Sequence, residues 1–294
     1  SVSGFTDKFL FYGFLPKTEK ELEKILISLS NINQTLVFFA PSYKINFYIK
    51  GKGRPLVLIH PLGLDHRLWD YCIGDLAEHR TLITFDLPGH GLSPVPDNNY
   101  SIEDISKNLL ESLRLADIDK ADFLGLSIGG MILQHFASVN ASMVEKLILV
   151  DTTFKYSKDW QLNWTERARI SREEGLENML EKLLEAFFTE DYLRKGSEDI
   201  DYCRDVISKM SGEGYALACE ALSRCNLEKS ASAITSQTLI LCGDRDNDLF
   251  KDATLWLSQN IPHSQYEWLA PAQHLSPLER RVDFLKIVRK FLEI

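Results

Sequence analysis

The ten residues DFLGLSIGGM, at positions 122–131, decide how the rest of the chain is interpreted. An apolar run that suits a short strand leads into Gly125-Leu126-Ser127-Ile128-Gly129, and an amphipathic run that suits a helix follows. A G-x-S-x-G motif between a strand and a helix is typical of a sharp turn that holds a nucleophilic serine above a sheet. A Cβ at either glycine would collide with the adjacent strand or helix. The motif alone is equally consistent with a structural turn, so the choice depends on the surrounding chain.

The composition limits the classes of protein that the chain can belong to. Of its 294 residues 45% are hydrophobic, which suffices for one large α/β domain with an insertion or for two ordinary domains. The net charge of -9 argues against a nucleic-acid partner. We find no apolar run of about 18 residues and no signal-peptide pattern, so we expect a cytoplasmic protein that does not enter a membrane.

The cysteines and the rest of the composition indicate no bound group. The five cysteines are odd in number and share no C-x-x-C spacing, which favours free thiols over a disulfide framework or a metal site. We therefore expect neither a metal nor a cofactor. The chain is compatible with a monomer or a homodimer.

Strand-like and helix-like segments alternate along most of the chain. Largely apolar runs, typical of strands buried on both faces of a parallel sheet, occur at residues 55–60, 82–86, 122–126, 146–151 and 238–242, and a last strand-like run occurs at 265–269. Helical spacing of apolar residues is found at residues 101–115 and 281–292. From residue 152 to about 230 the pattern is helical only, with helices predicted at 165–174, 176–186, 199–209 and 214–224. The fold class is therefore α/β, with a mostly parallel sheet and an all-helical insertion.

Candidates for an acid and a base follow the serine in the chain. His274 comes after the last strand-like run, and histidine is the natural base for a serine near neutral pH. A carboxylate would fix its tautomer and stabilise the imidazolium. Four carboxylates at strand ends compete for that role, namely Asp151, Asp244, Asp246 and Asp248. His90, in the loop at 87–93, is better suited to brace the backbone through hydrogen bonds.

These motifs resemble those of the α/β-hydrolases over residues 45–294, most closely the 3-oxoadipate enol-lactonase group. The stretches that carry the resemblance are IHPLGLDHRLWD, DLPGHGLS, GLSIGGMILQ, WTERARISREEGLENMLEKLLEAFFT, GEGYALACEAL and AQHLSPLE. The resemblance implies a nucleophile elbow at Ser127, with His274 as base and Asp246 as the acid in the family pattern G-x-x-D. It implies hydrolysis of a small carboxylic ester or lactone through an acyl-enzyme.

The same resemblance implies an oxyanion hole and a substrate pocket. The backbone amides of Leu62 and Ile128 are the expected oxyanion donors, with Pro61 standing where the family often has glycine. The helical insertion at 152–230 is expected to form a lid, or cap, over the hydrolase core at 44–151 and 231–294. Candidate substrate-binding residues on it are Trp160, Trp164, Arg167, Phe187, Phe188 and Tyr215. Arg167, Arg169 or Arg172 could meet a substrate carboxylate, although a solvated helix face is the favoured explanation for each of them.

Two sets of alternatives remain open at this point. Hydrolases of carbon–carbon bonds, thioesters and acyl-carrier-protein methyl esters use the same three residues, and lid shape selects among them. A non-catalytic ligand-binding protein of the same shape is the alternative of another class.

The N-terminal extension at 1–43 resembles a fragment of ribosomal-RNA 2′-O-methyltransferases of the tetrapyrrole methylase family. Because the rest of that family's cofactor site has no counterpart, we expect a relic without methyl transfer. A pairing of residues 35–39 with 45–49 would let this relic add a strand to the sheet.

Overall fold

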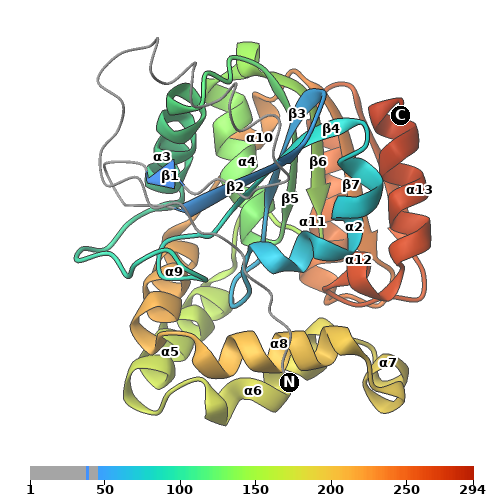
Figure 1. Cartoon of the computed structure of the whole chain (residues 1–294). Coiled ribbons are helices and arrows are strands. Elements are labelled where there is room, and N and C mark those ends of the chain that lie inside the picture. Colours follow the sequence, from blue (N-terminus) through green and yellow to red (C-terminus); the bar gives the residue numbers. More distant parts are fainter. Residues whose placement is uncertain (1–37, 40–45) are drawn as a thin grey trace, which may run out of the picture.

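A single eight-stranded sheet forms the centre of the computed structural model, which describes residues 38–39 and 46–294 (Figure 1). The strand order is β1-β2-β4-β3-β5-β6-β7-β8. All neighbours from β4 to β8 run parallel, and β2 joins β4 in the antiparallel sense. The strands are β1 (Phe38–Phe39), β2 (Asn46–Gly51), β3 (Arg54–Ile59), β4 (Arg80–Phe85), β5 (Ala121–Leu126), β6 (Val144–Val150), β7 (Gln237–Gly243) and β8 (Ser264–Leu269). The prediction of a mostly parallel α/β sheet is confirmed.

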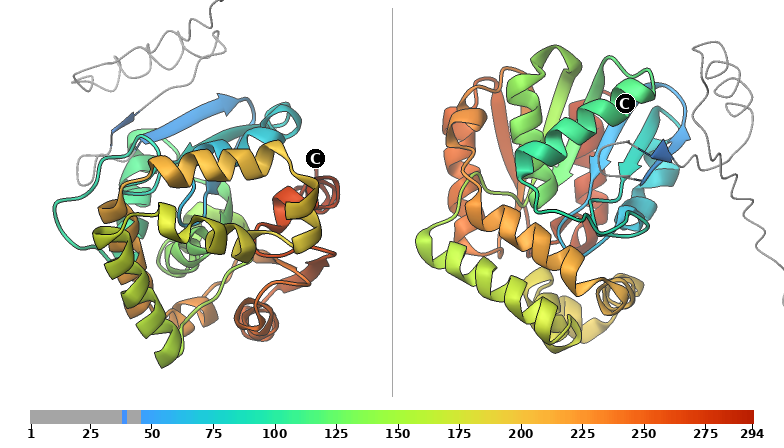
Figure 2. Two further views of the ribbon diagram at one scale, coloured as in Figure 1. Left: turned by 90° about the horizontal axis from the view of Figure 1, so that it is seen from below. Right: turned by 90° about the vertical axis from the view of Figure 1, so that its left-hand side faces the viewer.

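Helices cover both faces of the sheet (Figures 1 and 2). On one face α3 (Ile102–Leu115), α4 (Ile128–Val139), α10 (Glu228–Ser232) and α11 (Asp248–Asn260) pack side by side. On the other face α2 (Asp70–Leu76) packs against α13 (Arg281–Leu292), near the 3-10 turn η1 (His66–Trp69) and the short helix α12 (Ser276–Glu279). The central strands β3 to β7 are almost fully buried, which explains their continuous apolar sequence, whereas the edge strand β8 is largely half-buried or exposed.

Between β6 and β7 the chain forms a group of helices at one end of the sheet, which we call the inserted helices. They are α5 (Lys158–Glu173), α6 (Leu180–Phe187), α7 (Glu190–Lys195), α8 (Glu198–Lys209) and α9 (Gly212–Arg224), with the 3-10 turn η3 (Glu177–Met179). Figure 1 shows them below the end toward which the strand β6 points. They therefore stand at the carboxyl edge of the parallel strands, where sites of open α/β sheets lie.

The inserted helices differ from the sequence prediction in three places. Helix α5 begins at Lys158 rather than at 165, because the Ser157 hydroxyl caps it by accepting a hydrogen bond from the Trp160 amide. The segment predicted as one helix at 176–186 is divided into η3 and α6. Helix α7 was not predicted, although Thr189 caps it and acidic residues fill its first turn, which is a typical start signal.

The N-terminal predictions are only partly within the described residues. Strand β1 pairs antiparallel with β2, with Phe38 opposite Phe47 and Phe39 opposite Asn46, as the predicted pairing requires. The rest of the N-terminal extension lies outside the described residues.

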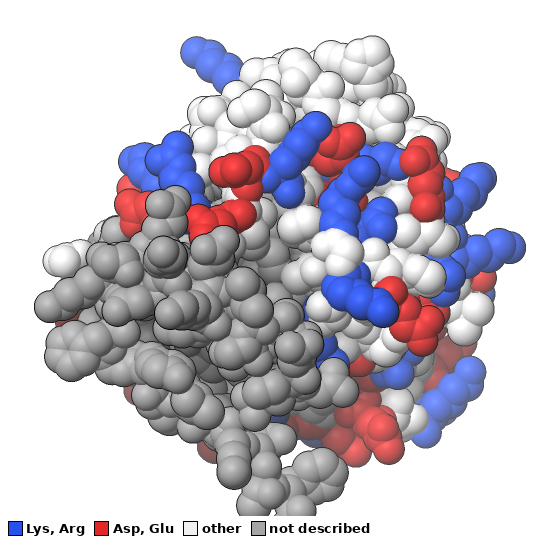
Figure 3. All heavy atoms as spheres, turned by 45° about the horizontal axis from the view of Figure 1, so that its top comes forward, with Lys and Arg blue, Asp and Glu red and all other residues white. Residues whose placement is uncertain are grey.

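The described surface carries both signs of charge. Figure 3 shows Lys and Arg side chains interspersed with Asp and Glu on one face of the molecule. The basic groups there do not form the single-sign surface that nucleic-acid binding favours. In the described part of the chain, no helix is long and apolar enough to cross a membrane.

Candidate active site

The turn at Ser127 has the strained geometry that the motif predicts. Ser127 lies between β5 and α4 with φ 55° and ψ −117°, a conformation that L side chains rarely adopt. A Cβ at Gly129 would stand 2.4 Å from the carbonyl oxygen of Ile59, and one at Gly125 would stand 2.5 Å from the backbone of Gly129. Only glycine lets the helix approach β3 and β5 so closely, so both glycines permit the turn that presents Ser127.

Ser127, His274 and Asp246 form one line of hydrogen-bonding groups. The Nε2 atom of His274 lies 3.0 Å from Ser127 Oγ, and its Nδ1 atom lies 2.8 Å from Asp246 Oδ2. Asp246 follows β7 and His274 follows β8, so adjacent parallel strands bring the two loops together. The side chains of His274 and Asp246 are 11% and 3% exposed, which keeps their interaction away from bulk water. This is the geometry in which a histidine takes a proton from a serine while a carboxylate orients it.

The electrostatics favour a protonatable His274. Burial lowers its pKa, but the charge of Asp246 and their hydrogen bond act in the opposite direction, and the net result is a pKa above the usual 6.5. Asp151 is a further buried carboxyl group, and it lies close to Asp246. Burial, followed by the charge of Asp246, raises the pKa of Asp151 to about 8.

The other candidate acids and the second histidine have different partners. Asp151 accepts hydrogen bonds from the Gly243 amide (2.8 Å) and the Ser276 hydroxyl (2.6 Å). Asp244 accepts one from the Ala272 amide at 3.0 Å. His90 is buried with Nδ1 3.0 Å from the Pro88 carbonyl oxygen, in agreement with a bracing role. Asp248 pairs with Lys251 on the surface.

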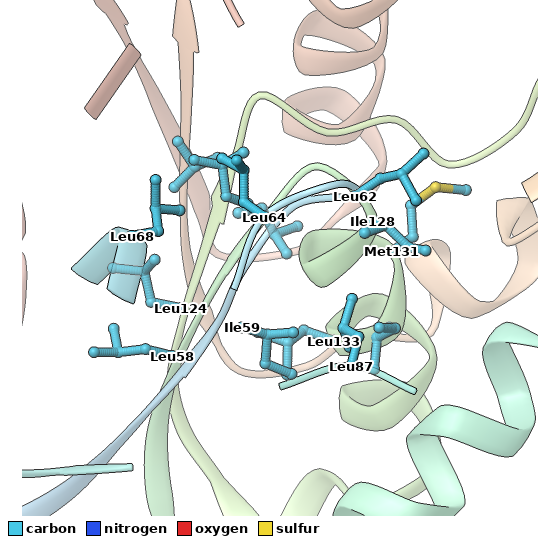
Figure 4. Close-up of a cluster of buried hydrophobic side chains, with 14 of the residues drawn as sticks. Leu58, Ile59, Leu62, Leu64, Leu68, Leu87, Leu124, Ile128, Met131 and Leu133 are labelled. Atoms are coloured by element: carbon cyan, nitrogen blue, oxygen red, sulfur yellow. The ribbon is translucent and has the colours of Figure 1, made fainter. Parts of the chain in front are cut away.

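Of the two expected oxyanion donors, one follows the serine directly and the other lines the same cavity. Ile128 is the first residue of α4, so its amide belongs to the helix start that has no acceptor within the helix. Leu62 follows β3 and lines the same cavity as Ser127. In Figure 4 the Leu62, Ile128 and Met131 side chains lie near one another within the buried hydrophobic cluster. The apolar packing of both residues fixes the loops that carry their amides.

A cavity of about 330 Å³ opens onto the serine. This volume is in the range of small-molecule sites. Its lining includes most of the predicted substrate residues, namely Trp160, Trp164, Arg167, Phe187 and Tyr215. Phe188 is outside this lining: its side chain is 1% exposed and stacks on Tyr192 at 5.2 Å between ring centroids. Adjacent residues at the end of a helix point in different directions, so only one of the two phenylalanines reaches the cavity.

The three arginines of α5 occupy different environments. Arg169 pairs with Glu166 and Glu173, and Arg172 pairs with Glu213 and Glu220. Arg167 lines the cavity with its guanidinium carbon 4.9 Å from the centroid of the Trp164 ring, and no carboxylate of the described residues forms an ion pair with it. It is therefore the arginine of α5 that is available to an anion in the cavity.

Several lining residues were missed in the sequence. Besides Pro61, they are Leu183, Ala186, Arg245, Asn247, Phe250 and Gln273. The Phe250 ring lies 4.3 Å from that of His274, between centroids. It lies in α11, whose start was signalled by Asn247 as N-cap and Asp248 in the first turn.

The described residues contain one buried set with metal-ligand chemistry. Asp151, Cys242 and Asp246 place ligand atoms within 4.8 Å of one another. Burial raises the pKa of the Cys242 thiol, and Asp151 is also shifted toward its protonated form. Asp246 is hydrogen-bonded to His274 and to the Asn247 amide. Neutral thiol and carboxyl groups are poor ligands, so this set does not fit a metal ion.

Comparison with known families agrees with this architecture. Residues 54–280 match the model of the alpha/beta hydrolase fold family. The chain belongs to this family, and its relatives support a hydrolase.

Among individual relatives, a 3-oxoadipate enol-lactonase of Acinetobacter baylyi is 25% identical over 90% of this chain and 99% of its own length. A pimeloyl-[acyl-carrier protein] methyl ester esterase of Legionella pneumophila is 27% identical over 83% of this chain and 97% of its own. The crystal structure of an enol-lactonase from Burkholderia xenovorans superposes with a TM-score of 0.84 and 29% identity, covering 88% of this chain and all of the other.

Proposed function

We propose that this hydrolase cleaves a small carboxylic ester or lactone through an acyl-enzyme formed on Ser127. The observation that carries the proposal is the hydrogen-bonded line from Ser127 through His274 to Asp246, whose three residues all line one cavity. A nucleophile bonded to a base, with the base oriented by a carboxylate, is the arrangement that activates a serine.

The proposed reaction has two halves. In the first, Ser127 Oγ attacks the carbonyl carbon while His274 Nε2 accepts the hydroxyl proton, and the same histidine then protonates the leaving alkoxide. In the second, His274 removes a proton from water, which attacks the acyl-enzyme and releases the acid. Asp246 remains ionised throughout and stabilises the imidazolium.

The amides of Leu62 and Ile128 are proposed to bind the oxyanion of both tetrahedral intermediates. Leu62 lines the cavity together with Ser127, Ile128 follows Ser127 directly at the start of α4, and the start of a helix carries a partial positive charge. Loss of one such donor typically costs about 3–4 kcal/mol of transition-state stabilisation.

We propose that residues 152–230 act as a lid over the core formed by 44–151 and 231–294, and that the lid selects an acyl group carrying an anion. Arg167 contributes a cation without a carboxylate partner among the described side chains. The buried Trp164 Nε1–H also lacks a hydrogen-bond partner within the described part of the chain, and such a donor is costly to leave unmatched. Together with Arg245, which also lines the cavity, these donors suit a carboxylate-bearing ester or lactone, in line with the enol-lactonase relatives.

An acyl-carrier-protein methyl ester is the second candidate substrate, because an esterase of that kind is similar over most of both chains. Carbon–carbon and thioester hydrolysis, and ligand binding without catalysis, remain outcomes of the following test.

The test is a panel of p-nitrophenyl acetate and butyrate, carboxylated lactones, methyl esters and thioesters, assayed on wild type and Ser127→Ala. We expect turnover of at least one ester or lactone, its loss by about 10⁴-fold or more in Ser127→Ala, and loss of labelling by a fluorophosphonate. Ser138→Ala, on the same helix but outside the cavity lining, is the matched control and should match wild type. Unchanged turnover in Ser127→Ala would refute the proposal, and hydrolysis restricted to thioesters or carbon–carbon bonds would redirect it.

A further inference from the structure

The loop that carries His274 is bonded directly to the inserted helices on both sides of the histidine. Before it, the Gln273 side-chain amide donates to the Glu185 carbonyl oxygen at 2.5 Å. After it, the Leu275 amide donates to the Phe187 carbonyl oxygen at 2.9 Å. Both acceptors lie at the carboxyl end of α6, so the same short segment holds the two flanks of His274.

One carboxylate completes this connection. Glu279 Oε1 accepts hydrogen bonds from the backbone N–H of Gln273 at 2.8 Å and from the backbone N–H of Thr189 at 3.2 Å. Its Oε2 atom accepts one from the Thr189 hydroxyl at 2.5 Å. No basic side chain forms an ion pair with Glu279 among the residues that the structure describes. Through these hydrogen bonds, the Glu279 carboxylate links the start of α7 to the residue before His274.

We propose that Glu279 and Thr189 are positioning residues. They couple the position of the inserted helices to the position of the His274 imidazole relative to Ser127. The α6–α7 junction, residues 185–189, and the histidine loop, residues 273–275, would move as one unit. A displacement of the junction would then lengthen the 3.0 Å separation between His274 Nε2 and Ser127 Oγ. This inference rests on the proposed function. It makes activation of the Ser127 nucleophile depend on the position of the lid relative to the histidine loop.

Misplacement of a reacting group by about 1 Å can reduce the rate about 100-fold. Ala186, Phe187 and Gln273 would move with this unit. The remaining wall on α5 and α9, which includes Trp160, Arg167 and Tyr215, would stay in place, so the change acts mainly on the chemical step. The signature is therefore a fall in kcat with little change in KM.

The test compares Thr189→Val with Thr189→Ser. Valine removes the hydroxyl that Glu279 accepts from, while serine retains it. Thr189 also caps α7, so Ser197→Ala, which removes the N-cap of α8 without touching Glu279, controls for cap loss alone. Kinetics on p-nitrophenyl butyrate and the rate constant of fluorophosphonate labelling are measured on each protein.

We expect Thr189→Val to lower kcat and the labelling rate constant by about 10-fold or more, with KM within about twofold, and Thr189→Ser and Ser197→Ala to remain near wild type. Glu279→Gln should give a similar loss, because its amide would face N–H and O–H donors. The double variant Thr189→Val/Glu279→Gln should lose no more activity than the more impaired single variant, since both substitutions break the same connection. If Glu279→Gln does not fold, the Thr189 pair decides.

Wild-type kcat in folded Thr189→Val, or an equal loss in Ser197→Ala, would overturn the inference. Additive losses in the double variant would overturn it too. Retained activity in Ser127→Ala would instead show that the proposed function is wrong. Loss in Ser127→Ala together with full activity in Thr189→Val would reject the coupling alone.

Discussion

Asp246 Oδ2 lies 2.8 Å from His274 Nδ1, whereas the nearby carboxylates of Asp244 and Asp151 are bonded to backbone amides and a serine. Three acids therefore surround one histidine loop, and one of them contacts the imidazole. The difference separates an orienting role from a structural one, and it can be measured by changing each acid to its amide.

Asp246→Asn should reduce kcat by about 10⁴-fold, because an asparagine side chain no longer stabilises the imidazolium and can favour the wrong tautomer. Asp244→Asn keeps an acceptor for the Ala272 amide and is the matched control, with a loss below about 10-fold. Steady-state kinetics on the best ester of the panel provide both values. An equal loss of kcat in the two variants would show that the assignment of Asp246 as the orienting acid is wrong.

The pH dependence of kcat/KM should have an acidic limb above pH 6.5. The pKa of His274 is raised, and the base must be neutral to accept the serine proton, so activity rises as pH increases through that pKa. In Asp246→Asn the favourable charge is gone while burial remains, so the limb should move to lower pH. A limb that stays in place after this substitution would mean that another group titrates.

Arg167→Gln should raise KM for carboxylated esters by about 10-fold or more and leave neutral esters nearly unchanged, because only the anion loses its partner. Arg169→Gln is the control, since its guanidinium is bonded to glutamates on the exposed face of the same helix. Kinetics with a matched pair of neutral and carboxylated esters distinguish the two. A similar loss for both esters in Arg167→Gln would point to a packing role beside Trp164.

Gly129→Ala should destabilise the protein by more than about 2 kcal/mol and abolish activity, since its Cβ would stand 2.4 Å from the Ile59 carbonyl oxygen. Gly74→Ala is the contrasting variant. Gly74 lies in α2 with nothing within 4 Å of its Cβ position, so alanine should stabilise by about 0.5–1 kcal/mol. Denaturant unfolding measures both. Equal stability of the two variants would mean that β3 and α4 can separate without loss.

Much of the fold follows from local sequence. The strands β3, β5, β6 and β7 were found because a strand buried on both faces must be apolar throughout, and such runs are visible without any partner. The turn at Ser127 was found because its glycines are required by backbone contacts on either side of one residue. The end of the last helix was equally clear from its amphipathic spacing. Short elements such as α7 were missed because few residues carry their periodic signal.

Local sequence patterns are enough to identify the chemical groups of the candidate site: a serine in a strained turn, a histidine after the last strand and acids at strand ends. Tertiary structure decided which of them touch. Ser127 and His274 are 147 residues apart, and their 3.0 Å separation depends on strand order and on the bonds that hold both flanks of the histidine loop. Likewise, Arg167 is distinguished from Arg169 and Arg172 only by the direction each takes from α5. Local patterns reflect the backbone's own preferences, whereas distances between distant side chains result from the packing of the whole chain.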